Sequence, residues 1–396
     1  MYSFSNRMNE VSARAVREIL KLTADPNVIA FSAGSPANEA FPIETIQEIM
    51  NEAMEKNGTK VLQYGITEGL DLLREAYLNH LAVPKGLSVS IDNIMTTTGA
   101  TQGIHLACDV FLDPGDVVLV ESPSFLSTLM LFKKYFVKCI PLEMDEDGIM
   151  IEDLEEKIRL HQPKMLYTIP TFQNPTGKTL PEERRKKIAE LASENNVIVL
   201  EDDPYGDLRY RGEEISPIKK FDQSGHVILI NSFSKIISPG LRVGAIVADE
   251  KILGKMTVSK QFADTHTTTL AQYVCAEFLN RNLLPEHLIS IRQLYKERME
   301  TMLNWMEVYF PKGTNYTKPD GGLFIWAELP GECNTQELLK KAVADYQVAF
   351  VPGAPYYINP QDGRNFMRLN FSANTPEKIQ EGMKRLSDLF SENHKF

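Results

Sequence analysis

Short apolar runs alternate with longer amphipathic stretches through the middle of the chain. The apolar runs predict buried strands at Val117–Val120, Met165–Ile169, Val197–Leu200 and Val227–Ile230. A segment rich in Glu, Lys and Ala, Pro181–Asn195, precedes the third run and predicts a helix. Strand, helix and strand at this spacing indicate an α/β fold, with a mainly parallel sheet covered by helices on both faces.

The pattern changes near Ile289, where a second helix-and-strand region begins. It contains a helical segment at Ile289–Val308, an apolar run at Gly321–Trp326 and a charged helix at Thr375–Glu392. The chain has 396 residues, which is too many for one small core. We expect a large domain over residues 46–288 and a smaller α+β domain over residues 289–396. Residues 1–45 are too short to fold alone and should pack with the smaller domain.

Composition narrows the class of protein. Hydrophobic residues make up 43% and charged residues 24% of the chain, which is typical of a globular protein. No apolar run reaches the roughly 18 residues of a membrane span, and the N-terminus lacks the apolar core of a signal peptide. The formal net charge of -11 argues against a nucleic acid as main partner. We therefore expect no membrane partner and a cytoplasmic protein.

Cysteines and histidines give no sign of a disulfide or a metal site. The 4 cysteines are far apart and form no CxxC pair, which fits a reducing compartment. The 7 histidines show neither HxxxH nor HExxH spacing, so we expect no zinc.

Polar residues follow three of the predicted strands. Asn174 comes after the Met165 strand, Asp202 after the Val197 strand and Ser232 after the Val227 strand. Ligands of parallel α/β sheets bind at the carboxyl ends of the strands. These three side chains should therefore share one site.

The segment Ser232-Phe233-Ser234-Lys235 suggests the chemistry of that site. Arg242 follows seven residues after Lys235, past a Pro239-Gly240 turn. A lysine that attacks a carbonyl needs a depressed pKa, and serines with an arginine suit a phosphate group. A lysine that holds pyridoxal 5′-phosphate as a Schiff base fits both needs. The tetrapeptide alone is weak, because most lysines are solvated surface charges.

The whole chain resembles the fold-type I, pyridoxal-phosphate-dependent class I/II aminotransferases. Within them it is similar to the branch of 2-aminoadipate and kynurenine aminotransferases. The resemblance rests on ordered motifs: Ser32-Ala33-Gly34-Ser35-Pro36, Gln63-Tyr64-Gly65, Thr98-Gly99-Ala100-Thr101-Gln102, Asn174-Pro175-Thr176-Gly177, Asp202-Asp203-Pro204-Tyr205, Ser232-Phe233-Ser234-Lys235 and Met367-Arg368-Leu369-Asn370-Phe371-Ser372. It implies transfer of an amino group from an L-amino acid to a 2-oxo acid by a ping-pong mechanism, with 2-oxoglutarate as the expected acceptor.

The resemblance also implies roles for residues around the cofactor. Lys235 would form the Schiff base and move the proton between Cα and C4′. Asp202, chosen over Asp203 because the family's tyrosine lies three residues after the acid, would pair with the pyridine nitrogen. Asn174 and Tyr205 would contact the phenolic oxygen, and Phe125 would stack on the ring. The phosphate would be held by Ser232, Ser234, Arg242 and the backbone of Ala100 and Thr101 at a helix N-terminus.

Further implied roles concern the substrate and a second subunit. Arg368 would clamp the substrate α-carboxylate, with Gly34 and Asn174 nearby. Tyr64 would reach the phosphate of the neighbouring subunit, which implies a homodimer with shared active sites. Arg17 matches a position that reads a side-chain carboxylate in relatives, although a solvated helix charge explains it equally well. With Arg17 in that role, the donors would be glutamate or 2-aminoadipate, and aromatic amino acids as well.

Two departures and two rival functions remain. The phosphate loop has Ala100-Thr101 where many relatives have Ser-Gln, and Phe125 stands where this branch often has tyrosine; both leave substrate tuning open.

A β-lyase or decarboxylase on the same fold would keep every cofactor residue. A transcription regulator with this domain would carry a helix-turn-helix in front of it. The catalytic-type segment is expected to begin within about ten residues of Met1, which leaves no room for that module, and the acidic net charge also argues against it.

Overall fold

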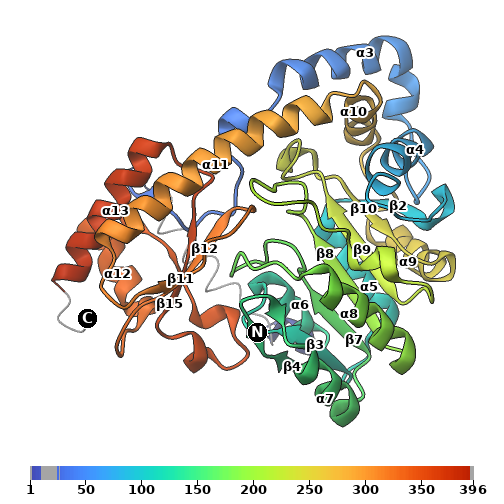
Figure 1. Ribbon diagram of the computed structural model, residues 1–396. Helices are drawn as coiled ribbons and strands as arrows, with labels where there is room; N and C mark the ends of the chain where they lie inside the picture. The colour runs from blue at the N-terminus through green and yellow to red at the C-terminus, as the bar shows by residue number, and fades with distance from the viewer. Residues whose placement is uncertain (1, 10–24, 26, 393–396) are drawn as a thin grey trace.

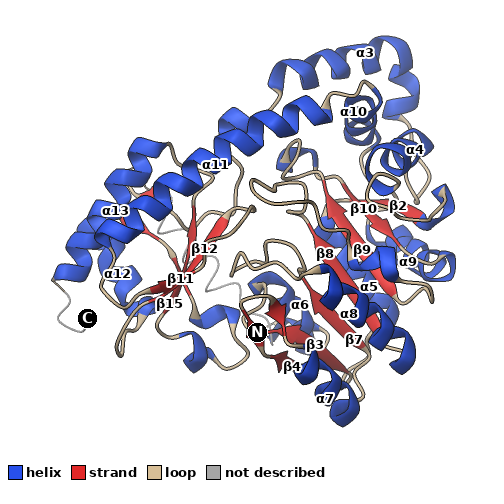
Figure 2. Ribbon diagram, viewed as in Figure 1, coloured by secondary structure: helices blue, strands red, loops and turns tan. Residues whose placement is uncertain are grey.

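The computed structural model describes residues 2–9, 25 and 27–392. A body built on a seven-stranded sheet lies beside a second body built on a four-stranded sheet (Figure 1). Figure 2 shows helices on both sides of the larger sheet. The fold class predicted from the sequence, α/β with a mainly parallel sheet, is confirmed.

The larger sheet has the strand order β2-β10-β9-β8-β7-β3-β4. Neighbouring strands from β9 to β4 pair in parallel, whereas β10 runs antiparallel to both β2 and β9. The strands are β2 (Ile94–Thr97), β3 (Val117–Glu121), β4 (Lys138–Leu142), β7 (Met165–Thr168), β8 (Ile198–Asp203), β9 (Val227–Ser232) and β10 (Gly244–Val247).

Side chains that alternate along these strands enter two different cores. Val118 and Val120 of β3 belong to the core that also contains α5 (Ala100–Phe111). Leu119, between them, belongs to a second core with α7 (Ile151–His161) and α8 (Glu182–Asn195). Successive strand residues point to opposite faces, so a strand covered on both faces must be apolar throughout. This explains why the predicted strands are continuous apolar runs.

The remaining helices of this body surround the sheet or pack at its end. They are α3 (Ile43–Leu62), α4 (Asp71–Tyr77), α6 (Leu126–Lys134), α9 (Glu250–Ala263) and α10 (Thr269–Asn280). A small hairpin of β5 (Met144–Asp145) and β6 (Gly148–Ile149) precedes α7. Near the N-terminus, the described residues include the short exposed helix α1 (Asn6–Asn9).

The second body is an antiparallel sheet in the order β11-β12-β15-β14 with helices packed against it. The long helix α11 runs from the neighbourhood of α10 across to α13 (Figure 1). The elements are α11 (Leu284–Tyr309), β11 (Asn315–Tyr316), β12 (Phe324–Glu328), α12 (Thr335–Tyr346), β13 (Val348–Ala349), β14 (Val351–Pro352), β15 (Phe366–Asn370) and α13 (Pro376–Ser391).

The segment before α3 joins this second body. Strand β1 (Ile29–Ala30) pairs in parallel with β13. The Phe31 N–H donates to the Ala349 carbonyl, and the Phe31 carbonyl accepts from the Asn370 N–H. The predicted domain border at residue 289 falls inside α11, a few residues after that helix begins. The helix therefore links the two bodies without a loop at that point.

Two predicted positions shift slightly. Asp202 and Ser232 are residues of β8 and β9, whereas the sequence placed them just after these strands. Backbone pairing with the neighbouring strands continues through both polar ends, which apolar patterning alone does not reveal.

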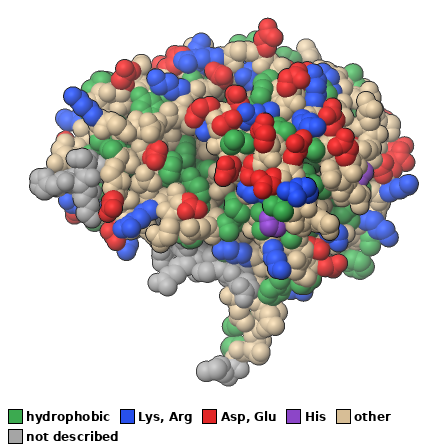
Figure 3. Space-filling model, turned by 60° about the horizontal axis from the view of Figure 1, so that its bottom comes forward, with side chains coloured by type: hydrophobic (Ala, Val, Ile, Leu, Met, Phe, Trp, Pro, Cys, Tyr) green, Lys and Arg blue, Asp and Glu red, His purple; other side chains and the backbone are tan. Residues whose placement is uncertain are grey.

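The surface shows a mixture of charges. On the face in Figure 3, acidic and basic side chains are interspersed, and they do not form the continuous basic stripe that a nucleic-acid backbone requires. Within the described residues, helices long and apolar enough to cross a membrane are absent.

Candidate active site

A cavity of about 390 Å³ lies at the carboxyl ends of the larger sheet's parallel strands and reaches the second body. Its volume suits a small-molecule ligand. Nearly all of the predicted site residues line it: Gly34, Ala100, Thr101, Phe125, Asn174, Asp202, Tyr205, Ser232, Ser234, Lys235, Arg242 and Arg368.

Lys235 follows β9 and extends its amine into this cavity. Its Nζ donates a hydrogen bond to the Gly34 carbonyl at 2.8 Å. Burial lowers the pKa of Lys235 to about 8, and the positive charges of Arg368 and Arg242 act in the same direction. A lysine in this state supplies the neutral amine that attacks a carbonyl near neutral pH.

Asp202, near the end of β8, is buried with one of its carboxylate oxygens unpaired. Oδ2 accepts a hydrogen bond from the Tyr167 hydroxyl at 2.8 Å, whereas Oδ1 has no partner among the described residues. Burial raises the pKa of Asp202 to about 7, although the Tyr167 hydrogen bond opposes this. A buried carboxylate oxygen without a donor is costly, so a ligand with a cationic N–H would stabilise it.

Asp203, the next residue along β8, has a different environment. It does not line the cavity, and its Oδ1 accepts the backbone N–H of Gly206 at 2.8 Å. The two neighbours point in opposite directions because side chains alternate along a strand. Of the two acids, the structure places Asp202 in the cavity.

Arg368 enters the cavity from β15 of the second body. Its Nη1 donates to Asn174 Oδ1 and its Nη2 to the Ser32 carbonyl, each at 2.9 Å. The guanidinium carbon lies 4.2 Å from the centroid of Phe324, which fixes the guanidinium plane. Its Nε is buried and has no acceptor among the described residues, so this arginine keeps capacity for an anionic ligand.

Asn174 and Tyr205 lie together on the cavity wall. Asn174 Nδ2 is 3.5 Å from the Tyr205 hydroxyl, and because its Oδ1 is engaged by Arg368, only the amide N–H groups remain for a ligand oxygen. Burial raises the pKa of Tyr205, so its hydroxyl stays protonated and able to donate.

The opposite end of the cavity is suited to an anion. The first turn of α5, with Ala100 and Thr101, presents backbone N–H groups there, and Arg242 faces the same region. Gly99 precedes the helix with φ of 79°, and a Cβ at this position would lie 2.4 Å from Arg242 Nη2. Glycine is therefore required for the close approach of the Arg242 guanidinium to the loop.

Of the two remaining predicted residues, one does not line the cavity and the other falls among residues whose structure is not described. Tyr64 is 81% exposed, outside the lining, and contacts His266 edge-on with ring centroids 5.9 Å apart. Arg17 lies outside the described residues.

Sequence reasoning missed several residues that shape this site. Gln173 holds the turn that carries Asn174: its amide donates to Glu121 and to the Pro123 carbonyl, and its Oε1 accepts the Thr176 N–H at 2.8 Å. Tyr167 lies in an apolar run, whose pattern predicts a strand and gives no sign of the hydrogen bond to Asp202. The missed residues that line the cavity itself with a polar or aromatic side chain are Ser32, Ser35, Ser127, Phe324 and Tyr356. Ser32 and Ser35 belong to the motif Ser32–Pro36, whereas Ser127 and Tyr356 belong to none of the family motifs.

The donor set fits pyridoxal 5′-phosphate. A lysine with a lowered pKa, an unpaired buried aspartate oxygen and an anion-binding helix N-terminus match its aldehyde, pyridine nitrogen and phosphate. These three features occur in one cavity of adequate size.

Comparison with known proteins gives matches over almost the whole chain. Residues 26–386 match the family model described as aminotransferase class I and II. The chain is 41% identical to aromatic-amino-acid aminotransferase 1 of Thermococcus litoralis, over 99% of this chain and 95% of that protein.

Two solved structures superpose closely. The kynurenine aminotransferase of Pyrococcus horikoshii, in complex with PMP, has a TM-score of 0.95 at 42% identity, covering 99% of this chain and 98% of that one. LysN, the α-aminoadipate aminotransferase of Thermus thermophilus, complexed with N-(5'-phosphopyridoxyl)-L-leucine, has a TM-score of 0.90 at 33% identity, covering 98% and 97%. From these matches and the cavity that fits the cofactor, the chain belongs to the class I and II aminotransferases, pyridoxal-phosphate-dependent enzymes of fold type I that transfer amino groups.

Proposed function

We propose that this aminotransferase moves the amino group of an L-amino acid to 2-oxoglutarate by a ping-pong mechanism in the cavity around Lys235. The observation that carries the proposal is the convergence of Lys235, Asp202 and Arg368 on one cavity, with buried atoms on both Asp202 and Arg368 that lack a partner among the described residues. Each of these atoms needs a ligand of defined charge.

Each residue has a separate task in this proposal. Bound pyridoxal phosphate supplies an electron sink for negative charge at the substrate Cα. Lys235 Nζ carries the proton from and to Cα, which its lowered pKa allows at neutral pH. Asp202 Oδ1 accepts a hydrogen bond from the pyridine N–H and keeps that nitrogen protonated. Asn174 and Tyr205 donate to the phenolic oxygen, and Phe125 packs on the ring.

The substrate carboxylate and the phosphate bind at separate places. Arg368, already fixed by Phe324 and Asn174, binds the α-carboxylate, with the Gly34 backbone beside it. Ser232, Ser234, Arg242 and the first turn of α5 hold the phosphate. The two cationic side chains, Arg368 and Arg242, select a substrate whose α-carboxylate lies at a fixed distance from the cofactor phosphate.

The donor side chain meets a mostly apolar wall. Phe125, Leu126, Phe324, Val351 and Tyr356 line the cavity, which favours aromatic donors. Dicarboxylic donors such as glutamate or 2-aminoadipate are proposed as well, with Arg17 as the residue that binds their side-chain carboxylate. Relatives named for aromatic, kynurenine and aminoadipate substrates support this range.

The active unit is proposed to be a homodimer, with Tyr64 reaching the phosphate of the other subunit. Its 81% exposure leaves the side chain available for this contact. We also propose that residues 46–288 form the large domain and residues 1–45 and 289–396 the small one. The free thiols Cys108, Cys139 and Cys275 support a reducing, cytoplasmic location.

The test is the visible absorption of the cofactor-loaded protein. Single L-amino acids are added, then 2-oxoglutarate. We expect aromatic and dicarboxylic amino acids to abolish the cofactor's absorption band and 2-oxoglutarate to restore it. Release of ammonia, thiol or CO2 in place of an oxo acid would contradict the proposal. Loss of the response to glutamate but not to phenylalanine in Arg17→Ala would support the role of Arg17.

A further inference from the structure

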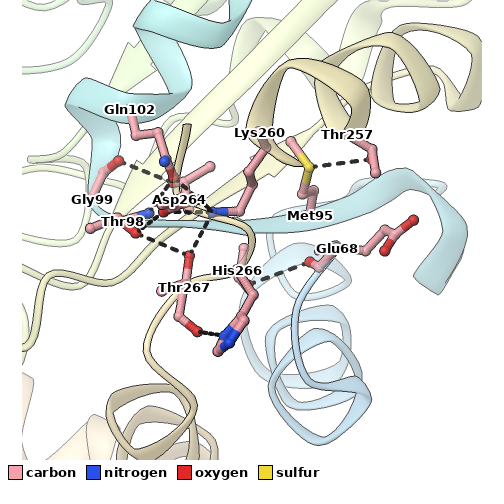
Figure 4. Close-up of polar contacts among 12 residues, drawn as sticks. Glu68, Met95, Thr98, Gly99, Gln102, Thr257, Lys260, Asp264, His266 and Thr267 are labelled. Carbon is pink, nitrogen blue, oxygen red and sulfur yellow. Dashed lines mark hydrogen bonds and ion pairs between the residues drawn. The ribbon is translucent and has the colours of Figure 1, made fainter. Parts of the chain in front are cut away.

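A cluster of polar side chains lies outside the cavity, behind the first turn of α5. It consists of Thr98, Gln102, Lys260, Asp264 and Thr267, and we call it the Lys260 cluster (Figure 4). Thr98 lies just before α5, Gln102 lies in the first turn of that helix, Lys260 lies on α9, and the other two residues follow α9. None of the five lines the cavity.

Lys260 is the centre of this cluster and is fully buried. Its Nζ donates to Gln102 Oε1 at 2.9 Å, to Asp264 Oδ1 at 2.8 Å and to Thr267 Oγ1 at 3.1 Å. The three N–H groups of an ammonium therefore all have acceptors. A buried ammonium is retained only when it is paired and hydrogen-bonded in this way.

The contacts of the cluster converge on Thr98. Its backbone N–H donates to Gln102 Oε1 at 2.7 Å, and its hydroxyl donates to Asp264 Oδ2 at 2.6 Å. Its carbonyl lies 3.5 Å from Arg242 Nη2. Thr98 is thus held from both its backbone and its side chain, and it directly precedes Gly99, the residue from which α5 begins.

We propose that Lys260 is a positioning residue for the cofactor phosphate, acting through Gln102 and Thr98. Gln102 Oε1 accepts from both Lys260 and the Thr98 N–H, so the ammonium fixes the amide that fixes the loop. The loop then sets the direction of the first N–H groups of α5 and the place of Arg242. The inference rests on the phosphate end proposed above.

The experiment compares two ligands that differ only in the phosphate. Cofactor-free protein is titrated with pyridoxal phosphate and with pyridoxal, and each Kd is read from the visible absorption of the bound ligand. For Lys260→Met we expect the Kd of pyridoxal phosphate to rise about tenfold, as for loss of a hydrogen bond near a charge, and the Kd of pyridoxal to stay unchanged.

Matched variants separate positioning from general damage. Lys255→Met makes the same change at an exposed position of the same helix and should alter neither Kd. Gln102→Met removes the shared acceptor and keeps the buried charge. We expect it to weaken pyridoxal phosphate selectively as well, and it tests the inference even if Lys260→Met does not fold. Equal weakening of both ligands, or of neither, in these cluster variants overturns the inference.

The variant Arg242→Met distinguishes a failure of this inference from a failure of the proposed phosphate site. If Arg242→Met weakens pyridoxal phosphate selectively while the cluster variants do not, the phosphate end is correct and the role of Lys260 is wrong. If Arg242→Met weakens both ligands equally, the phosphate assignment fails and the inference about Lys260 fails with it.

Discussion

Asp202 and the Lys260 cluster differ in how far the protein itself supplies hydrogen-bond partners for buried charged groups. Lys260 has acceptors for all its donors, and its partner Asp264 accepts from it and from Thr98. Asp202 has one oxygen paired with Tyr167 and one oxygen without a donor among the described residues. A satisfied cluster stabilises the protein by itself, whereas an unsatisfied one is stabilised by a ligand. We therefore interpret the Lys260 cluster as structural support and the surroundings of Asp202 as part of a ligand-binding site.

The pKa shifts follow the same division. Burial raises the pKa of Asp202 to about 7. Burial also acts to raise the pKa of Asp264, but its hydrogen bonds with Lys260, Thr98 and Gln102 outweigh this and hold that pKa below its usual value. Two aspartates near the same cavity thus differ in which protonation state the fold favours, because the protein itself supplies one of them with more donors than the other.

The largest expected effect is the loss of turnover in Lys235→Ala. The variant lacks the amine that, in the function proposed above, binds the cofactor aldehyde and acts as the base at Cα, so we expect turnover to fall by about three orders of magnitude or more. The measurement is oxo-acid production from the best amino donor. Lys255→Ala, at an exposed position, is the control and should keep full activity. Normal turnover in Lys235→Ala would refute the assignment.

Next in size is a pair of Asp→Asn variants with opposite effects on stability. Between the unfolded pKa of 3.8 and the folded pKa of about 7, folded Asp202 holds a proton that the unfolded chain has released. The free energy of unfolding of the cofactor-free protein therefore falls as pH rises through this window. We expect the free energy of unfolding of Asp202→Asn to exceed that of wild type by on the order of 4 kcal/mol at pH 8, and by much less near pH 4.

Asp264→Asn should behave in the reverse way. Its folded pKa is lowered, so its contribution to stability is present above the unfolded pKa and is lost as pH falls through the folded one. Removing this carboxylate leaves the Lys260 ammonium poorly paired. Because the Asp264 side chain is partly exposed, we expect a loss of about 2 kcal/mol at pH 8, as for a hydrogen bond to a charged group. Urea unfolding of both cofactor-free variants measures the two values. If both variants changed the free energy of unfolding in the same direction, Asp264 and Asp202 would not differ as structural support and binding site.

The smallest expected effect concerns the pH dependence of cofactor capture. The neutral fraction of Lys235 falls about tenfold for each pH unit below its pKa of about 8. The rate at which cofactor-free protein captures pyridoxal phosphate should therefore rise with pH and level off above pH 8. Stopped-flow absorbance measures this rate. Arg368→Gln removes one of the charges that lower the pKa, so the midpoint should move to higher pH. A midpoint at the ordinary lysine value in wild type would show that burial does not lower this pKa.

The sequence by itself determined the order of the elements and the core of the site. Strands covered on both faces are mostly apolar, so the greater part of β3, β7, β8 and β9 is visible as continuous apolar runs. Asp202 and Lys235 lie within a few residues of the ends of the apolar runs 197–200 and 227–230, and topology alone brings strand ends together. Their place in the cavity could therefore be predicted from local pattern and motif.

Tertiary structure decided the contacts between residues that are far apart in the chain. Arg368 meets Asn174 and Ser32 because β15 belongs to the second body, and no periodicity links these positions. The same holds for Lys260 and Gln102, whose residue types resemble ordinary surface residues of two helices. Local patterns report which face of an element is buried. Which polar groups meet there depends on how the elements pack, since a buried charge is stable only where partners from other elements surround it.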